Sequence, residues 1–417
     1  FARNVRDIRQ VASLTAELQR IAAEAGVPEL AIAIDQEGGM VARLTEGVAL
    51  MPGNMAIAAG GSPEAAFEAA RVTGEELRAL GITLNYAPVL DVNINPANPV
   101  IGVRSYGESP KLVGEFGVQA IRGLQLEGVA ATAKHFPGHG DTDVDSHLDL
   151  PTVAHSRQRI REVELEPFRQ AIAAGVDAIM TSHIVFPAFE NGNVPATLSR
   201  RLLTGLLREE LGFGGVIMTD CMEMKAIADH FGTVEAAVMA LEAGADCVLI
   251  SHSHRLQEAA IDAIAAAVRS GRLSRERIAE SAARLLAMKR KRAAAAASAA
   301  AAADAEGAVL TGSPVHAVRS AGEFRASEGS DPLRRVGCRE HREVARRISE
   351  ASITLVKSEG GLLPLRRERT LVISMAAAAV SEVDESVGLP VTLGQALAAE
   401  GIEAIERIVD LDSVAEQ

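Results

Sequence analysis

The sequence predicts an α/β fold in which parallel strands form a barrel that is surrounded by helices. Between residues 30 and 251, short apolar runs alternate with amphipathic helical stretches, the pattern of repeated strand–helix units. Almost every apolar run ends in a charged or hydrogen-bonding residue. An open doubly wound sheet would gather such residues at one switch point, whereas a barrel collects them around one face. The pattern therefore favours a TIM-type (β/α)8 barrel.

The expected strands are near-continuous apolar runs, as buried parallel strands are. In chain order they are Leu30–Ile34, Leu84–Leu90, Val129–Ala133, Ala178–Ser182, Gly215–Thr219 and Cys247–Ser251. The expected helices include Ser62–Ala79, Lys111–Glu127 and Arg157–Ala174, and another follows the last strand to about Arg292. The polar residues at the strand ends are Asp35, Asp91, Lys134, His135, His183, Asp220 and Ser251.

Three segments are expected along the chain: a catalytic barrel over 1–292, a linker over 293–340 and a partial α/β domain over 341–417. The tract Ala293–Ala305 is almost pure alanine and has no amphipathic face to bury, which is typical of a linker. Leu371–Ser374 is the expected strand of the last segment. The chain opens at Phe1 with a stretch that reads like the end of a buried strand, so we expect the natural N-terminus to lie upstream.

Composition excludes several kinds of partner. The formal net charge is −13 and the basic residues are scattered, which argues against nucleic acid and anionic membrane surfaces. No apolar run reaches the ~20 residues of a membrane span. Three cysteines without a CxxC spacing indicate neither a disulfide framework nor a zinc site. We expect a cytoplasmic monomer that uses no cofactor and no metal.

The segment KHFPGHGDTDVDSH at Lys134–His147 leaves a strand and places three histidines and three aspartates within 13 residues. It is too polar for the core. A solvated loop and a metal site are alternatives, but the spacing matches no familiar closed metal pattern. We favour a third interpretation, in which Asp145 holds the imidazole of His147 in one tautomer and keeps its pKa near neutrality. His147 would then give and take a proton.

A single carboxylate, Asp220, follows the apolar strand Gly215–Thr219. Burying an unpaired carboxylate is costly, so Asp220 needs cationic partners or a chemical role. It could cap the following helix. Placed near the anomeric carbon of a sugar, it could instead attack that carbon and form a covalent intermediate.

Charged groups elsewhere at the strand ends suit a small, highly polar ligand. The sequence DQEGG at Asp35 offers a carboxylate for sugar hydroxyls and glycines for a close turn, and Arg43, Arg104, Lys134 and His135 add positive charge and hydrogen-bond donors. The chain has no Trp and only two Tyr, which disfavours an extended platform for long polysaccharides. We interpret Ser251-His252-Ser253-His254 as a loop at the mouth rather than a metal site, and His183 as a pocket candidate without a role.

Four motifs together resemble one family. DQEGG at Asp35, KHFPGHGDTDVDSH at Lys134–His147, PATLSRRLL at Pro195–Leu203 and MTDCMEM at Met218–Met224 resemble the bacterial β-N-acetylglucosaminidases of glycoside hydrolase family 3, in order, over roughly residues 1–290. SITLVKSEGGLLPL at Ser352–Leu365 resembles the start of the second domain, an α/β sandwich, in two-domain members.

The resemblance implies a TIM-type barrel whose first strand and most of whose second would precede Phe1. It implies Asp220 as nucleophile and His147, partnered by Asp145, as acid/base. Asp35, Arg43, Arg104, Lys134 and His135 fall on residues that bind N-acetylglucosamine. The implied substrate is N-acetylglucosamine β-linked to (anhydro-)N-acetylmuramic acid. A phosphorylase, another β-glycosidase of the family and a non-catalytic sugar-binding barrel remain as alternatives.

Overall fold

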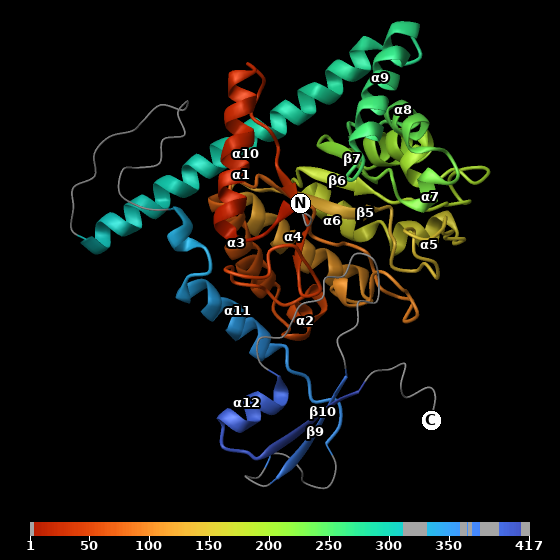
Figure 1. Cartoon of the computed structure of the whole chain (residues 1–417). Coiled ribbons are helices and arrows are strands. Elements are labelled where there is room, and N and C mark those ends of the chain that lie inside the picture. Colours follow the sequence, from red (N-terminus) through yellow and green to blue (C-terminus); the bar gives the residue numbers. More distant parts are fainter. Residues whose placement is uncertain (1–3, 312–331, 359–364, 366–368, 376–391, 410–417) are drawn as a thin grey trace. The chain divides into compact units, whose positions relative to one another are not determined.

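The computed structural model describes residues 4–311, 332–358, 365, 369–375 and 392–409. The chain separates into two compact units, Phe1–Ser352 and Ile353–Gln417, which we treat one at a time (Figure 1).

The first unit contains a sheet of six parallel strands. These strands are β1 (Ala33–Ile34), β4 (Leu84–Asn85), β5 (Ala130–Phe136), β6 (Ala178–Thr181), β7 (Val216–Cys221) and β8 (Cys247–Leu249), and they pair in the order β1-β4-β5-β6-β7-β8. Each overlaps one of the predicted apolar runs. Strands that neighbour each other in chain order, joined by helical crossovers, are the arrangement of a TIM-type barrel, so the predicted fold class is confirmed.

Strand β4 is shorter than the predicted run Leu84–Leu90 because Pro88 has no N–H to donate. Pairing with β5 nevertheless resumes beyond it. Val89 bridges Lys134, and the N–H of Leu90 donates to the carbonyl of Lys134 over 2.6 Å. The carboxyl end of this strand therefore stays registered beside Lys134.

Helices flank the strands much as predicted (Figure 1). The α-helices before β7 are α1 (Ile8–Glu24), α2 (Asn54–Ala59), α3 (Pro63–Ala79), α4 (Pro110–Leu126), α5 (Arg157–Glu162) and α6 (Glu166–Ala173). A π-helix, η4 (Arg201–Glu210), comes directly before β7. The prediction of one helix over Arg157–Ala174 is wrong, because two helices with a break at 163–165 replace it. Pro167, at the start of α6, cannot donate to the carbonyl of Val163, which the continuing helix would require.

After β7 come α7 (Lys225–Ala228) and α8 (Thr233–Ala243), and after β8 come α9 (His254–Ser270) and α10 (Arg275–Thr311). The expected single helix to Arg292 is therefore two helices. The first ends at Gly271, which has a left-handed conformation (φ 79°) that glycine adopts without strain.

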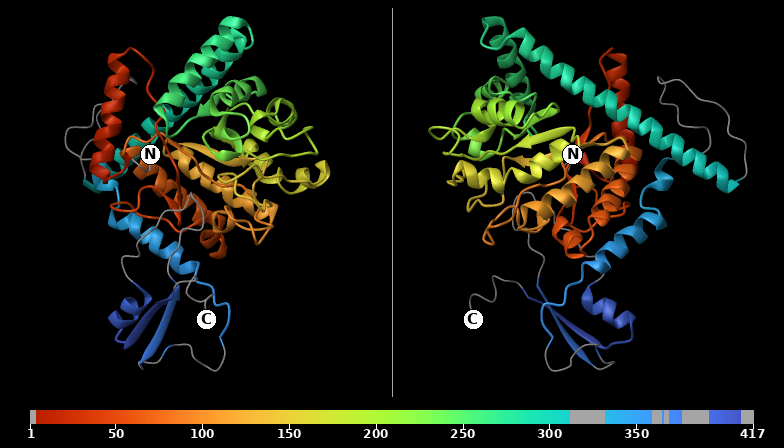
Figure 2. Two further views of the ribbon diagram at one scale, coloured as in Figure 1. Left: turned by 45° about the vertical axis from the view of Figure 1, so that its right-hand side comes forward. Right: turned by 180° about the vertical axis from the view of Figure 1, so that it is seen from behind.

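The linker prediction is wrong for Ala293–Thr311, which forms the second half of α10, one uninterrupted helix in Figure 2. Alanine has the highest helix propensity, and its small side chain allows close packing: Ala296 lies against the backbone of Gly128. Arg292, just before the tract, ion-pairs with Asp177 over 2.8 Å. Residues 312–331 of the predicted linker lie outside the described part.

The expected boundary at 341 also differs from the structure. Helix α11 (Arg339–Ala351) belongs to the first unit, where it packs on α2 and α3. His341 is buried and its two ring nitrogens lie 3.2 Å from Glu75 and 2.8 Å from Glu76, both on α3. The side chains of Ala345 and Ile348 join the same core.

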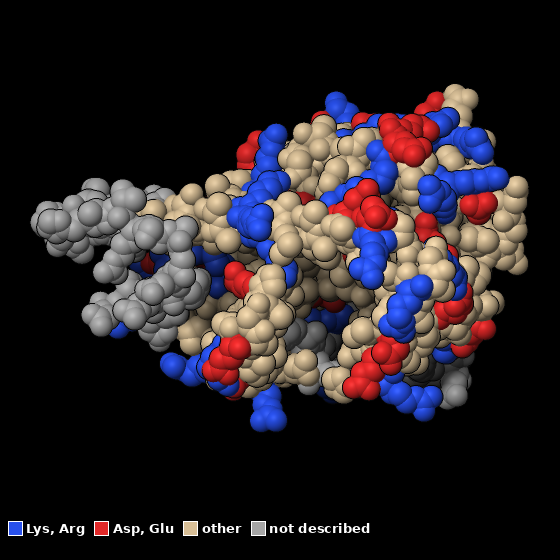
Figure 3. Space-filling model, turned by 90° about the horizontal axis from the view of Figure 1, so that it is seen from above, with Lys and Arg blue, Asp and Glu red and all other residues tan. Residues whose placement is uncertain are grey.

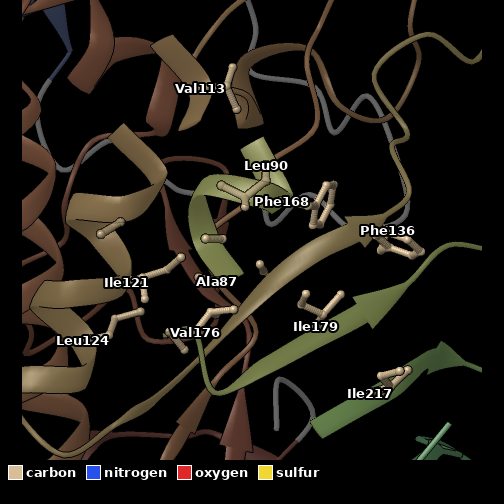
Figure 4. Close-up of a cluster of buried hydrophobic side chains, with 14 of the residues drawn as sticks. Ala87, Leu90, Val113, Ile121, Leu124, Phe136, Phe168, Val176, Ile179 and Ile217 are labelled. Carbon is tan, nitrogen blue, oxygen red and sulfur yellow. The ribbon is translucent and has the colours of Figure 1, made fainter. Parts of the chain in front are cut away.

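The two faces of the sheet carry different apolar clusters. Toward the flanking helices, alternate strand residues such as Ala131, Ala133, Ile179 and Ile217 share one apolar cluster with residues of α4 and α6. Figure 4 labels Ile179 and Ile217 within this cluster. The residues between them point the other way and form a second cluster, Leu84, Ala130, Ala178, Met180, Val216 and Met218, which Met288 of α10 joins. This period of two decides which side chains enter the barrel interior.

The second unit is an α/β arrangement in its described part, as predicted. Strand β9 (Thr370–Met375) includes the expected strand Leu371–Ser374 and pairs in parallel with β10 (Ala404–Val409). Between them in sequence lies α12 (Leu393–Ala399). Residues 359–364 of the segment Ser352–Leu365 lie outside the described residues.

The surface in Figure 3 shows acidic and basic side chains interspersed, without a basic patch on that face. Among the described helices, none combines the length and apolarity that crossing a bilayer requires.

Candidate active site

Strand alternation brings Lys134 and Asp220 to the barrel interior. Ala130, Val216 and Met218 point toward the barrel interior. Lys134 lies an even number of residues from Ala130 along β5, and Asp220 an even number from Val216 and Met218 along β7, so both lie on this inward face of their strands. Both lie at the carboxyl ends of their strands. The same face of the barrel therefore receives a cation from one strand and a carboxylate from another.

Glu37 is the centre of a buried ion network at this face. Its Oε1 lies 2.7 Å from Lys134 Nζ and 2.8 Å from an amino nitrogen of Arg104, and its Oε2 accepts from Arg104 Nε over 3.0 Å. Burial alone would raise the pKa of Glu37, but the charges of Arg104 and Lys134 outweigh it and hold the pKa well below its usual range. Glu37 is thus an ionised carboxylate that fixes two cations.

Asp35 shares Lys134 with Glu37 but faces solvent. Its Oδ1 lies 2.9 Å from Lys134 Nζ, and its side chain is 33% exposed, against 3% for Glu37. Among the contacts of the described residues, Oδ2 of Asp35 has no protein partner. One carboxylate of the DQEGG motif therefore builds the site, and the other is free to accept hydrogen bonds from a ligand.

The two glycines of that motif are required by the turn that presents it. The strands β2 (Gln36–Gly38) and β3 (Val41–Ala42) form a small hairpin in which Gly38 and Gly39 both have positive φ, 95° and 58°. A Cβ on Gly39 would stand 2.8 Å from the Cα of Gly53. The close turn predicted from the sequence is present.

Arg43 is not joined to this network. Its backbone N–H donates to Gln36 Oε1 over 3.0 Å, and within the described residues its guanidinium forms no ion pair with Asp35 or Glu37. Its assignment to ligand binding stays a prediction.

Asp91, fully buried after β4, orients His135. The carboxylate accepts from the backbone N–H of His135 over 3.1 Å and of His139 over 2.7 Å, and its Oδ2 lies 2.7 Å from Nδ1 of His135. Burial would raise the pKa of Asp91, but the neighbouring histidines lower it, so the carboxylate is ionised and can only accept. His135 therefore carries its proton on Nδ1, which leaves Nε2 for a ligand.

His139 anchors the loop that follows. It is buried, and its ring lies 2.8 Å from Oγ1 of Thr142 and 3.0 Å from Oγ of Ser146. Burial lowers the pKa of His139 to about 4, so the ring is neutral at pH 7. His139 therefore stabilises the loop through hydrogen bonds to Thr142 and Ser146 and carries no charge at pH 7.

Two further His–Asp pairs flank the loop. His155 pairs with Asp141, and His230, just after α7, lies 3.1 Å from Oδ1 of Asp149. The second pair connects the loop to the segment that follows Asp220. His139, Asp141, Asp145 and His147 thus each have a partner of their own, and the described residues of this loop form no group with the spacing of metal ligands.

Asp145 and His147 form the pair that the sequence predicted. Oδ1 of Asp145 lies 2.7 Å from Nδ1 of His147 and accepts the backbone N–H of the same residue over 2.9 Å. Burial would raise the pKa of Asp145 and lower that of His147, but their mutual contact reverses both, so the pKa of Asp145 falls and that of His147 rises. The Asp145 carboxylate accepts a hydrogen bond from the protonated Nδ1 of His147. Nε2 of His147 can therefore exchange a proton with a ligand.

Asp220 lies among three histidines. Its Oδ1 accepts the backbone N–H of Cys221 over 2.7 Å. Burial would raise the pKa of Asp220, but His135, His183 and His147 lower it, in that order, and the charge of Asp220 in turn raises the pKa of His147. Asp220 and the imidazole of His147 therefore lie close enough for each to shift the pKa of the other.

His183 has a supporting place. Its ring is buried, with Nδ1 2.8 Å from Oγ1 of Thr197 and Nε2 donating to the carbonyl of Cys221 over 3.0 Å. Burial lowers the pKa of His183 against the opposing charge of Asp220, and the ring fixes the backbone beside Asp220.

The structure thus brings together Asp35, Arg104, Lys134, His135, Asp145, His147 and Asp220. Sequence reasoning missed Glu37 and His139, although both lie inside motifs that were singled out, and it noted Asp91 only as a strand end. The two acids of DQEGG, separated by Gln36, were the one available signal that a second carboxylate takes part. Which of two neighbouring carboxylates is buried cannot be read from composition.

The comparison with known families now decides the relationship. The profile described as "Glycosyl hydrolase family 3 N terminal domain" matches residues 1–288. The chain belongs to glycoside hydrolase family 3. The family resemblance inferred from the four motifs is confirmed.

Individual relatives point the same way. Over 312 residues the chain is 41% identical to a protein named beta-hexosaminidase A from Pseudoalteromonas piscicida, and the match covers 69% of this chain and 52% of that protein. It is 32% identical to a beta-N-acetylglucosaminidase/beta-glucosidase from Cellulomonas fimi, over 86% of this chain and 59% of that one. The family 3 chain described here therefore spans between half and three fifths of the length of these two relatives.

A solved structure matches the whole chain. It is that of a glycoside hydrolase family 3 beta-N-acetylglucosaminidase from Paenibacillus sp. str. FPU-7, with a TM-score of 0.84, 47% identity, and coverage of 100% of this chain and 74% of the other. The match extends the family relationship beyond the barrel.

Proposed function

We propose that this chain carries the active site of a retaining exo-β-N-acetylglucosaminidase that releases terminal N-acetylglucosamine from peptidoglycan fragments. The observation that carries the proposal is the Asp145–His147 pair beside Asp220. A paired imidazole with a raised pKa suits an acid/base, and an ionised carboxylate at a strand end suits a nucleophile. The names of the two relatives and of the matching structure support the choice of sugar.

In the first step, an oxygen of Asp220 attacks the anomeric carbon of the bound sugar. The bond from that carbon to the aglycone oxygen breaks, and Nε2 of His147 gives its proton to the departing oxygen. The resulting imidazole is neutral, and Nδ1 keeps its proton, which it donates in a hydrogen bond to Asp145. A covalent glycosyl ester on Asp220 results.

In the second step, a water molecule attacks the same carbon from the side that the aglycone left. His147 now accepts the water proton, the ester bond to Asp220 breaks, and the sugar leaves with its original configuration. Both steps use one imidazole and one carboxylate, where most glycosidases use two carboxylates.

The ion network would bind the sugar. Asp35 offers a partly exposed carboxylate for hydroxyl groups, and Lys134 and Arg104 are held in place by Glu37. His135 offers Nε2 in a tautomer fixed by Asp91. The part of Arg43 in binding rests on the family resemblance alone.

Three alternatives remain to be separated. Transfer of the glycosyl group to phosphate would yield a sugar phosphate in place of free N-acetylglucosamine. A β-glucosidase would accept a substrate without the 2-acetamido group, as the name of the Cellulomonas fimi relative includes that activity. A non-catalytic barrel would bind sugar and release nothing.

The deciding experiment compares release of p-nitrophenol from the aryl N-acetyl-β-glucosaminide and from the aryl β-glucoside, with and without phosphate. We expect turnover of the N-acetylated substrate that Asp220→Asn abolishes and a chelator leaves unchanged. Asp229→Asn, an exposed carboxylate on the same connection, is the matched control and keeps full activity.

His147→Ala adds a second criterion. p-Nitrophenolate is a good leaving group and needs little protonation by a general acid. His147→Ala therefore loses far more activity on a disaccharide with an alkyl aglycone than on the aryl substrate. His254→Ala, which removes an exposed histidine, shows no such difference. A folded wild-type protein that turns over neither substrate, with or without phosphate, contradicts the proposal.

A further inference from the structure

A group of three possible metal ligands lies beside Asp220 and has no role in the proposed reaction. Cys221 ends β7, Glu223 follows it by two residues, and His252 belongs to the loop after β8. The ligand atoms of the three side chains all lie within 4.8 Å of one another. Two separate strand ends therefore contribute to one cluster.

The spacing fits a small divalent ion. Sγ of Cys221 lies 3.9 Å from Oε2 of Glu223, and Nδ1 of His252 lies 3.4 Å from the same oxygen. Tetrahedral zinc, with bonds of about 2.3 Å to sulfur and about 2.0 Å to nitrogen and oxygen, needs ligand–ligand separations of roughly 3.3–3.6 Å. The two separations to Glu223 need little change, whereas Sγ of Cys221 and the ligand nitrogen of His252, within 4.8 Å of one another, would have to approach by up to about 1.2 Å.

The carboxylate of Glu223 is already oriented for this purpose. Its Oε2 accepts the backbone N–H of His252 over 2.7 Å, and its Oε1 accepts that of Ser253 over 3.0 Å. Each oxygen keeps a second lone pair, and its side chain is only 12% exposed. Such bonds from outside the ligand set fix the direction in which a carboxylate meets a metal.

The cluster is also accessible. The His252 side chain is 50% exposed, so an ion can enter from solvent, and water can complete the fourth position. A thiolate, an imidazole and a carboxylate are a donor set that selects zinc and the similarly thiophilic cobalt or cadmium over magnesium or calcium.

We propose that Cys221, Glu223 and His252 form a binding site for a zinc-like divalent ion, and that occupation of this site inhibits the enzyme. On binding, the Cys221 thiol releases its proton to solvent and forms a sulfur–metal bond, with no change in oxidation state. The inhibition rests on the proposed function, whereas the binding does not.

The inhibition has a physical basis in the neighbouring bond. The backbone N–H of Cys221, the first ligand, donates to Oδ1 of Asp220 over 2.7 Å. A dication bound to Sγ of the same residue, three bonds from that nitrogen, attracts the electron density of the carboxylate and restrains the end of β7. A nucleophile held in this way attacks the anomeric carbon more slowly.

The first test measures binding without turnover. Cobalt(II) is titrated into the metal-free wild-type protein, and a sulfur-to-cobalt charge-transfer band with a stoichiometry of one is expected. Competition with zinc then gives the zinc affinity. Cys221→Ser abolishes the band, and His252→Ala, which removes a ligand, weakens zinc binding by more than the roughly 10–100-fold that the loss of a partner outside the ligand set costs. Cys338→Ser and His254→Ala, which remove a cysteine and a histidine outside the cluster, change neither.

The second test measures inhibition of the same proteins by zinc on the aryl N-acetyl-β-glucosaminide. Wild type, Cys338→Ser and His254→Ala are inhibited and recover with chelator, whereas Cys221→Ser keeps its activity. A missing charge-transfer band, or equal zinc affinity in all variants, overturns the site. Binding that leaves turnover unchanged overturns the inhibition. Binding in a protein with no glycosidase activity would leave the metal site standing and refute only the proposed function.

Discussion

Oε1 of Glu37 lies 2.7 Å from Nζ of Lys134, and both side chains are only 3% exposed. The pair comes from two different strand–helix units of the barrel, and Arg104 joins it from a third segment. Glu37 thus neutralises two buried cations, while Asp35 adds a second carboxylate at the edge that faces solvent. The network holds its charges before any ligand arrives.

Replacing Glu37 by Gln is expected to destabilise the protein by about 3–5 kcal/mol, because Lys134 and Arg104 would be left buried without full compensation. Urea unfolding, followed by circular dichroism, measures this loss. Asp35→Asn is the matched control. Its side chain is partly exposed and Lys134 keeps Glu37, so stability changes by less than about 1 kcal/mol while sugar turnover falls. Equal destabilisation by both substitutions would show that Glu37 is not the centre of the network.

The pH dependence of turnover reports the Asp145–His147 contact. In the proposed reaction His147 is the general acid and must be protonated, and contact with Asp145 raises its pKa against the opposing effect of burial. Asp145→Asn removes that charge, so the alkaline limb of kcat/KM moves to lower pH, and kcat falls by roughly 10²–10⁴-fold. Asp143→Asn, an exposed carboxylate of the same loop, leaves the profile in place. An unshifted alkaline limb in Asp145→Asn would mean that another group is the acid.

His341 joins α11 to α3, and its titration is expected to lower the free energy of unfolding as the pH becomes alkaline. Burial would lower its pKa, but Glu75 and Glu76 raise it to about 9. The folded protein holds this proton more tightly than the unfolded chain, whose histidine pKa is about 6.5. The contribution, roughly 3 kcal/mol, is therefore complete below about pH 6.5 and is lost as pH rises through about 9.

Urea unfolding of His341→Ala and wild type across this range is the measurement. The difference between them should be largest at about pH 6 and should shrink toward about pH 9.5. Arg346→Ala, which breaks only exposed pairs on the same helix, gives a small difference at every pH. A constant gap between His341→Ala and wild type would contradict the assignment.

His139 makes the opposite contribution, on the acid side. Because burial lowers its pKa to about 4, the unfolded chain takes up a proton below about pH 6.5 while the folded protein does not. Stability is therefore lost as pH falls from about 6.5 toward 4, by roughly 3 kcal/mol. His139→Gln removes this titration, so its stability declines less steeply than that of wild type over the same interval.

Thermal or urea unfolding of the two proteins at several pH values measures the slopes. The exposed histidine substitution His254→Gln provides the control and follows wild type. Parallel curves for wild type and His139→Gln would show that His139 is protonated in the folded loop.

Local patterns in the sequence determined the fold class and most of the candidate site. Apolar runs identified the six strands, because buried parallel strands need side chains that are apolar on both faces. The residues that follow these runs, such as Lys134 and Asp220, were recognised because strand ends at one barrel face are where polar side chains gather. The Asp145–His147 pair could also be predicted, since two residues of separation suffice for an aspartate to reach a histidine.

Tertiary structure alone decided which neighbour each charge meets. Nothing local distinguishes Glu37 from Asp35. Only the turn through Gly38 and Gly39 buries Glu37 against Lys134. The same turn leaves the side chain of Asp35 partly exposed. In the same way, the composition of the alanine tract after Arg292 does not show that Ala296 packs against Gly128, a residue far away in the sequence. Burial and long-range pairing set the charge states of this site, and neither is a property of a sequence segment taken by itself.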